Sequence, residues 1–135
     1  MPLSCMRLIN QQPDFVLISH SHYDHLCSAS VAALRAHFGE GRRANASTSA
    51  SDAAPASAPL HWYVPLGLAA WFKSAGVHAV TELDWWQEAR HGAVRVACTP
   101  AQHWSQRTPW DAMQTLWSSW CVAHHFNKLI GANLA

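Results

Sequence analysis

The chain has 135 residues, enough for one domain with a hydrophobic core and too few for two domains of ordinary size. Half of the residues are hydrophobic and 13% are charged, which excludes a disordered tail. The net charge at pH 7 is +1 and no Lys/Arg block is present, which argues against a nucleic-acid partner.

The cysteines and the first residues bear on the cellular compartment. Cys5, Cys27, Cys98 and Cys121 are scattered without a CxxC pair, so we expect reduced thiols in an intracellular protein. Residues 1–12 lack the pattern of a signal peptide, and no apolar window is long enough for a transmembrane helix. The expected location is therefore cytoplasmic or peripheral to a membrane.

The first predicted elements are a strand and a helix. Residues 15–18, Phe-Val-Leu-Ile, form an apolar run that is typical of a strand buried on both faces. A helix that Ser28 or Ser30 caps is expected to follow, with apolar positions up to Phe38 and a stop at Gly39. The segment between the two lies where α/β folds place ligands.

The rest of the chain continues as one domain, 1–135, with an interruption. Residues 40–59 are rich in Ala, Ser and Pro and have little to bury, which predicts a disordered surface insertion. After it, periodicity predicts a strand at 61–64, a helix at 68–75 and strands at 77–83, 94–98 and 116–122.

A histidine-rich motif, HxHxDH, directly follows the first predicted strand. In extended backbone, residues two apart point to the same side, so His20 and His22 can converge on one ion. Asp24 and His25 follow where the chain must turn, and can face a second ion. Histidine and carboxylate are regular zinc ligands. His103, at another strand end, is a further candidate, and a metal site is favoured over surface histidines.

Other side chains keep two interpretations. Asp84 either supports a ligand histidine or caps a helix, and Arg107 meets a phosphate or pairs with a carboxylate. Tyr23 is expected to donate a supporting hydrogen bond rather than to act in catalysis. Core packing is favoured over a lipid pocket for Trp85, Trp86, Trp104, Trp110, Trp117 and Trp120. Surface or edge positions are expected for His37, His61, His78 and His91.

The HxHxDH motif with a later histidine resembles the metallo-β-lactamase superfamily. Further segments resemble the N-acylphosphatidylethanolamine-hydrolysing phospholipase D family within it. They are Val-Pro-Leu-Gly-Leu at 64–68, Glu-Leu-Asp-Trp-Trp at 82–86, Thr-Pro-Ala-Gln-His-Trp at 99–104, Arg-Thr at 107–108 and Leu-Trp-Ser-Ser-Trp at 116–120. The resemblance implies an α/β fold, the αββα sandwich of this superfamily, of which the chain carries roughly the first half.

The resemblance also implies a reaction. In that family two zinc ions hold a hydroxide, which attacks a phosphodiester and releases N-acylethanolamine and phosphatidic acid. It assigns His20, His22 and His103 to the first zinc and Asp24 and His25 to the second, with Asp24 acting in catalysis beside the zinc-bound water. The implied partners are a phospholipid at a membrane surface and a second copy in a homodimer.

The chain also departs from the family pattern. It lacks the bridging Asp of a Gly-Asp-Thr-Gly segment and a final histidine, and Asp111, His124 and His125 do not match those positions. We therefore expect a truncated chain that binds one zinc or none and is inactive by itself. The alternatives are another hydrolase of the metallo-β-lactamase fold and a non-catalytic zinc-binding fragment.

Overall fold

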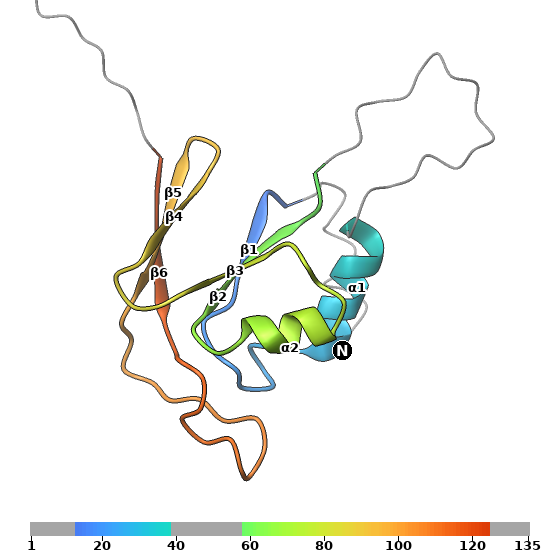
Figure 1. Cartoon of the computed structure of the whole chain (residues 1–135), viewed down its shortest axis with the longest axis vertical. Coiled ribbons are helices and arrows are strands. Elements are labelled where there is room, and N and C mark those ends of the chain that lie inside the picture. Colours follow the sequence, from blue (N-terminus) through green and yellow to red (C-terminus); the bar gives the residue numbers. More distant parts are fainter. Residues whose placement is uncertain (1–12, 39–57, 125–135) are drawn as a thin grey trace, which may run out of the picture.

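The structure, a computed structural model, describes residues 13–38 and 58–124. These residues form two helices and six strands, which are β1 (Phe15–Leu17), α1 (Ser28–Phe38), β2 (His61–Pro65), α2 (Ala69–Ser74), β3 (Val80–Leu83), β4 (Glu88–His91), β5 (Val94–Thr99) and β6 (Ser119–His124). Three layers result: both helices cover one face of the sheet β1–β3, and β4–β6 lie against its other face (Figure 1). The insertion predicted at 40–59 lies outside the described residues, except for residues 58 and 59.

The first sheet is parallel because a helix separates each of its strands from the next and carries the chain back. Its order is β1-β2-β3, with Val16 beside Trp62 and Trp62 beside Val80. The strand predicted at 61–64 is confirmed and continues to Pro65. The predicted helices are confirmed as α1 and α2.

The central strand β2 supplies both halves of the core, because successive side chains of a strand point to opposite faces. Trp62 and Val64 pack with Val31 of α1 and Phe72 of α2. Tyr63, between them, points to the other face, where it packs with the second sheet. The parallel sheet is thus covered by apolar contacts on both sides.

The second sheet is antiparallel and has the order β4-β5-β6. A two-residue turn joins β4 to β5, and Gly92 takes a positive φ of 57° in it. Val96 and Cys98 of β5 are fully buried and pack with Tyr63 and Leu83 of the first sheet. The alternation that predicted β5 therefore reflects one face turned to the core.

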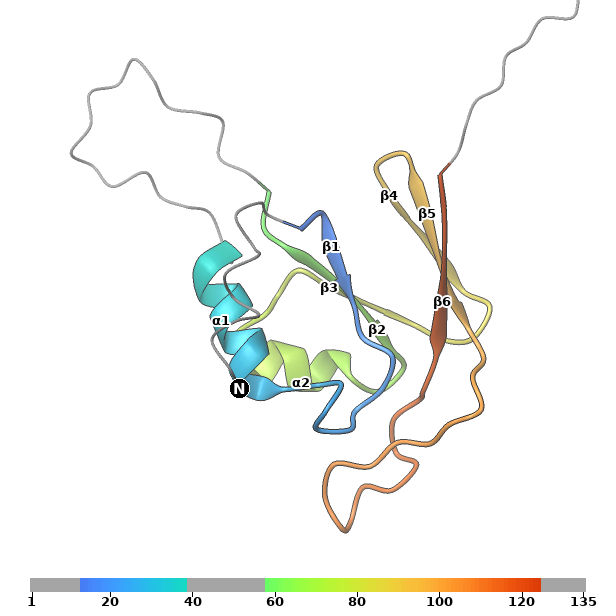
Figure 2. The ribbon, with the colours of Figure 1, turned by 180° about the vertical axis from the view of Figure 1, so that it is seen from behind.

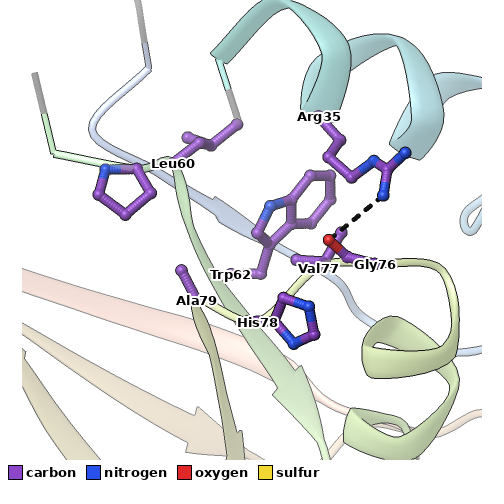
Figure 3. A pocket seen from close by; sticks show the side chains of 8 residues that line it. Arg35, Leu60, Trp62, Gly76, Val77, His78 and Ala79 are labelled. Atoms are coloured by element: carbon purple, nitrogen blue, oxygen red, sulfur yellow. Dashed lines mark hydrogen bonds between the residues drawn. The ribbon is translucent and has the colours of Figure 1, made fainter. Parts of the chain in front are cut away.

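A small pocket separates α1 from the turn after α2 (Figure 3). Nη1 of Arg35 donates to the Gly76 carbonyl at 3.4 Å. Gly76 has a φ of +78°, a conformation that favours glycine, and a Cβ there would lie 1.9 Å from Nη1 of Arg35 and would displace that flexible side chain. The pocket holds about 20 Å³, room for about one water, and Trp62 and His78 also line it.

Several predicted boundaries were wrong. β1 is half-buried rather than buried on both faces, because in the described part it pairs with β2 alone. The strands predicted at 77–83 and 116–122 are shorter or shifted, as β3 and β6. Cys27, not a serine, occupies the N-cap of α1, since its carbonyl accepts the Val31 N–H at 3.0 Å.

The prediction of core packing was wrong for three tryptophans. Trp86 is 74% exposed, Trp104 46% and Trp110 85%. Trp86 lies in a turn with a φ of 70°, and the other two lie in the segment between β5 and β6, from which no residue joins either hydrophobic cluster of the described residues. Trp85, Trp117 and Trp120 are half-buried instead.

Candidate metal centre

The first candidate ligands lie on the loop between β1 and α1, at the carboxyl end of a parallel strand. His20 is buried and His22 is half-buried. The loop then turns back on itself, because the N–H groups of His25 and Leu26 both donate to the His22 carbonyl, at 3.1 and 2.7 Å. Leu26 is fully buried in the core, which anchors the end of the loop.

His103 reaches the same place from the segment between β5 and β6. Both views show this segment next to the loop after β1 (Figure 1; Figure 2). Nε2 of His103 lies 2.8 Å from Nε2 of His20 and 3.2 Å from Nδ1 of His22. The structure therefore brings His103 next to His20 and His22, which lie 83 and 81 positions earlier in the sequence.

The chemistry of these three imidazoles fits a metal ion. A neutral imidazole has one N–H, so Nε2 of His103 can share a proton with one of its two neighbours but not with both. The other of the two contacts then brings two lone pairs together, unless a cation lies between them. Four-coordinate zinc with bonds of 2.0–2.1 Å separates its ligand nitrogens by about 3.3 Å, close to the separations seen here.

His20 is prepared for metal binding by its surroundings. Nδ1 of His20 lies 2.9 Å from the Ser19 hydroxyl, and a proton held on Nδ1 leaves Nε2 free to face the other two rings. Burial, followed by the proximity of His103, lowers the pKa of His20 from 6.5 to about 4. The ring is therefore neutral near pH 7, which is the form that binds metal.

Asp24 and His25 lie beside this triad but do not join it. Oδ2 of Asp24 lies 3.5 Å from Nε2 of His25, and the side chains are 78% and 51% exposed. The His25 ring packs against the His20 ring with centroids 4.3 Å apart. Among the described residues, no third potential ligand gathers with this pair. Their predicted place on a second zinc, and the catalytic role of Asp24, stay predictions.

Residues 117–120 hold both ligand-bearing segments in place. The Ser118 N–H donates to the Ser19 carbonyl at 2.8 Å, and the Trp120 indole N–H donates to the Ile18 carbonyl at 2.9 Å. These two bonds fix the chain immediately before His20.

Trp117 does the same for the other segment. Its indole N–H donates to the Ala101 carbonyl at 3.0 Å, two residues before His103. Its own carbonyl accepts the indole N–H of Trp85 at 2.7 Å. The resemblance includes these tryptophans, but their bracing role was not predicted, because hydrogen bonds to backbone carbonyls leave no sequence signal on the acceptor side.

Two interpretations were open for Arg107, contact with a phosphate and pairing with a carboxylate. Among the described residues its guanidinium contacts backbone carbonyls, and contact with a phosphate stays a prediction. Nη1 donates to the carbonyls of Ser21 and Leu26, at 2.9 and 2.6 Å. The Tyr23 ring lies 4.4 Å from its central carbon, and Tyr23 is 65% exposed. Tyr23 therefore serves as a stacking surface for Arg107, and the supporting hydrogen bond expected of its hydroxyl stays a prediction.

Asp84 acts within its own turn. Its carboxylate accepts the Trp85 N–H at 2.7 Å, and its N–H donates to Gln87 Oε1 at 2.9 Å. Both hydrogen bonds are local, as in a helix cap, but the residues that follow Asp84 form a turn and not a helix. In the part of the chain that the structure describes, Asp84 does not contact the candidate ligands; its two hydrogen bonds brace the entry to β4.

Of the histidines predicted at surface or edge positions, His61 is half-buried on the central strand β2, and His91 is half-buried at the end of the edge strand β4. His61 Nε2 lies 2.8 Å from the Thr81 hydroxyl, and His91 Nδ1 lies 3.2 Å from the Tyr63 hydroxyl. Burial, and then the nearby His91, lowers the pKa of His61. His37 and His78 are exposed, as predicted.

Comparison with known proteins places the chain among related sequences. Residues 2–130 match the family described as Beta-lactamase superfamily domain. The chain is 31% identical over 123 residues to the mitochondrial N-acyl-phosphatidylethanolamine-hydrolyzing phospholipase D of Saccharomyces cerevisiae, covering 88% of this chain and 22% of that protein. It is 34% identical over 118 residues to the corresponding phospholipase D 1 of Caenorhabditis elegans, covering 81% and 28%.

A third relative, an uncharacterized protein of Mycobacterium tuberculosis, is 39% identical over 109 residues, which cover 79% of this chain and 24% of that protein. The chain thus spans between a fifth and a third of the length of these relatives. In the described residues, no helix has the length and apolar character needed to cross a membrane. The match over 2–130 and the α/β layers agree with the predicted fold class, and the chain belongs to the metallo-β-lactamase superfamily.

Proposed function

We propose that this chain is the metal-binding part of a zinc-dependent phosphodiester hydrolase, one that releases N-acylethanolamine and phosphatidic acid from N-acylphosphatidylethanolamine. The observation that carries the proposal is the convergence of the His20, His22 and His103 nitrogens. The substrate class comes from the printed names of the yeast and nematode relatives.

Each residue of the triad has a defined task in this proposal. His20 and His103 offer Nε2 and His22 offers Nδ1 as neutral ligands, so the site keeps the full charge of a dication for an anionic phosphodiester. A zinc ion held by these three residues would lower the pKa of a bound water and would neutralise charge on phosphoryl oxygens. Asp24 and His25, exposed at the same edge, are open to solvent and to substrate.

The experiment is a hydrolysis assay in mixed micelles with a metal-depleted protein that contains this chain. N-acylphosphatidylethanolamine, another phosphodiester, a carboxylic ester and a lactone are compared, each with and without added zinc. Zinc-dependent release of N-acylethanolamine supports the proposal. Zinc-dependent activity on the ester or lactone alone would favour another hydrolase of this fold, and metal-loaded protein without activity on any phosphodiester would refute the proposal.

A second candidate is a non-catalytic chain that binds a single zinc. It is favoured by the absence, among the described residues, of a third ligand beside Asp24 and His25. Equilibrium dialysis of the 135-residue chain is expected to give at most one zinc per chain. Two tightly held zinc ions per chain would contradict this candidate.

The proposed partners are a phospholipid surface and a second copy of the chain. Flotation with vesicles of phosphatidylethanolamine and sedimentation equilibrium test them separately. Protein that stays with the soluble fraction would count against the first, and a monomer mass at micromolar concentration would count against the second.

A further inference from the structure

Arg107 joins the two ends of the metal-binding loop. Its Nη1 donates to the carbonyl of Ser21, directly after His20, and to the carbonyl of Leu26, directly after His25. Ser21 is 3% exposed and Leu26 is 0% exposed, so these carbonyls have little access to water. Hydrogen bonds from a charged donor are roughly twice as strong as neutral ones, and a buried carbonyl that loses its donor is costly.

The guanidinium is also held between two aromatic rings. Its central carbon lies 4.4 Å from the centroid of Tyr23 on the loop and 5.1 Å from that of Trp71 on α2. Stacking of this kind fixes the plane of a guanidinium. The ammonium group of a lysine is not planar and cannot stack in this way. Arg107 is therefore oriented by the loop and by α2 together.

The backbone that carries Arg107 is fixed as well. Oδ1 of Asp111 accepts the N–H groups of Arg107 and Thr108, at 2.8 and 2.7 Å. These hydrogen bonds, that of Thr108 first, lower the pKa of Asp111, so this carboxylate keeps its charge. His103 lies four residues before Arg107 in the same segment, so the clamp connects that segment directly to the loop that holds His20 and His22.

We propose that Arg107 is a positioning residue of the metal centre, which closes the loop of residues 20–25 and fixes its distance from His103. This inference rests on the proposed zinc site. It gives Arg107 a role that neither interpretation from the sequence named, because Nη1 acts on two backbone carbonyls.

The first test is the zinc affinity of the chain, measured by competition with a chromophoric chelator. Arg107→Met keeps the apolar stem and removes the donors, and is expected to weaken zinc binding by roughly 10- to 100-fold. Arg107→Lys keeps a charged donor but loses the planar stacking, so its zinc affinity is expected to lie between those of Arg107→Met and the wild type. Arg95→Met, which removes a surface arginine paired with Glu88, is the matched control and is expected to bind like the wild type.

The second test uses zinc-free protein and so does not depend on the proposed function. Amide hydrogen exchange, followed by mass spectrometry, is expected to accelerate in peptides covering 19–27 of Arg107→Met and to stay unchanged in peptides covering 88–99. A residue that supports only global stability would accelerate both regions, and that result overturns the proposal.

Three further results of these measurements also decide whether Arg107 fixes the loop. A folded Arg107→Met chain with wild-type zinc affinity and wild-type exchange overturns the proposal. If Arg107→Met fails to fold, Arg107→Lys is decisive, and wild-type values for it in both measurements overturn the proposal. If the wild type binds no zinc, the proposed function fails, while the exchange comparison still decides whether Arg107 fixes the loop.

Discussion

The indole nitrogen of Trp120 donates a hydrogen bond of 2.9 Å to the carbonyl of Ile18. Trp120 is the second residue of β6, the strand that follows the His103 segment, and Ile18 ends the apolar run that leads into the histidine motif. The bond therefore joins the two sheets at the point where both deliver candidate metal ligands.

Replacing Trp120 tests this joint. Trp120→Phe keeps an aromatic ring, removes the donor and leaves the Ile18 carbonyl unpaired, so we expect the free energy of unfolding to fall by about 1–3 kcal/mol. Urea denaturation measures this free energy of unfolding. Trp110→Phe is the control, because Trp110 is 85% exposed and its change is expected to stay within about 0.5 kcal/mol. Equal losses in both variants would contradict a specific role for the Trp120 bond.

Zinc binding depends on the triad of histidines. His22→Ala removes one of three converging nitrogens, and we expect zinc measured by inductively coupled plasma analysis after gel filtration to fall to background. His78→Ala removes an exposed histidine and is expected to keep the wild-type zinc content. Zinc retained by His22→Ala at the wild-type level would exclude His22 as a ligand.

The stability of the metal-free chain is expected to depend on pH. The folded state lowers the pKa of His61 and lowers that of His20 to about 4, so below the ordinary value of 6.5 the unfolded chain binds more protons. Stability is then complete above about pH 6.5 and falls as the pH drops toward 4.

Urea denaturation in chelator at several pH values checks this dependence. His61→Gln is expected to flatten the slope, because the substituted side chain does not titrate, and the His20 contribution is expected to remain. His78→Gln is the control and should keep the wild-type slope. A wild-type slope in His61→Gln would assign the pH dependence to other groups.

A side chain at Gly67 is expected to destabilise the fold. Its φ is +92°, and a Cβ there would lie 3.2 Å from the Gln114 carbonyl oxygen and 3.2 Å from Cα of Thr115. Gly67→Ala is expected to lower the free energy of unfolding by about 1–3 kcal/mol, from backbone strain and from this contact.

Gly92 offers a matched comparison for Gly67. It also has a positive φ, +57°, but a Cβ there would meet nothing within 4 Å. Gly92→Ala is therefore expected to cost less than Gly67→Ala in thermal denaturation. A cost for Gly92→Ala equal to or larger than that for Gly67→Ala would show that contact with the 114–115 backbone contributes nothing.

The sequence predicted those parts of the fold whose signals are local. The strand at β2, both helices and the alternation in β5 each follow from apolar periodicity. β4 was missed because Ala89 is its one apolar residue, and it exists as a strand through its pairing with β5 across the Gly92 turn. Its formation depends on the partner strand more than on its own composition.

The candidate site likewise has one part that the sequence could predict and one that it could not. His20 and His22 could be paired from their spacing alone, and His103 from its position after a strand and from the resemblance. The clamp by Arg107 could not be predicted, because its acceptors are the backbone carbonyls of Ser21 and Leu26, which any residue provides. Only three-dimensional proximity identifies such a contact.

The separation of the bracing contacts along the chain sets the order of folding. Ser19 and Ser118 are 99 positions apart, and His20 and His103 are 83 apart, so these contacts close large loops at a high cost in chain entropy. The helices and the β4–β5 hairpin need no such closure. The histidine triad is therefore expected to assemble last, and the rate at which zinc is captured during refolding reports the final docking of the two sheets.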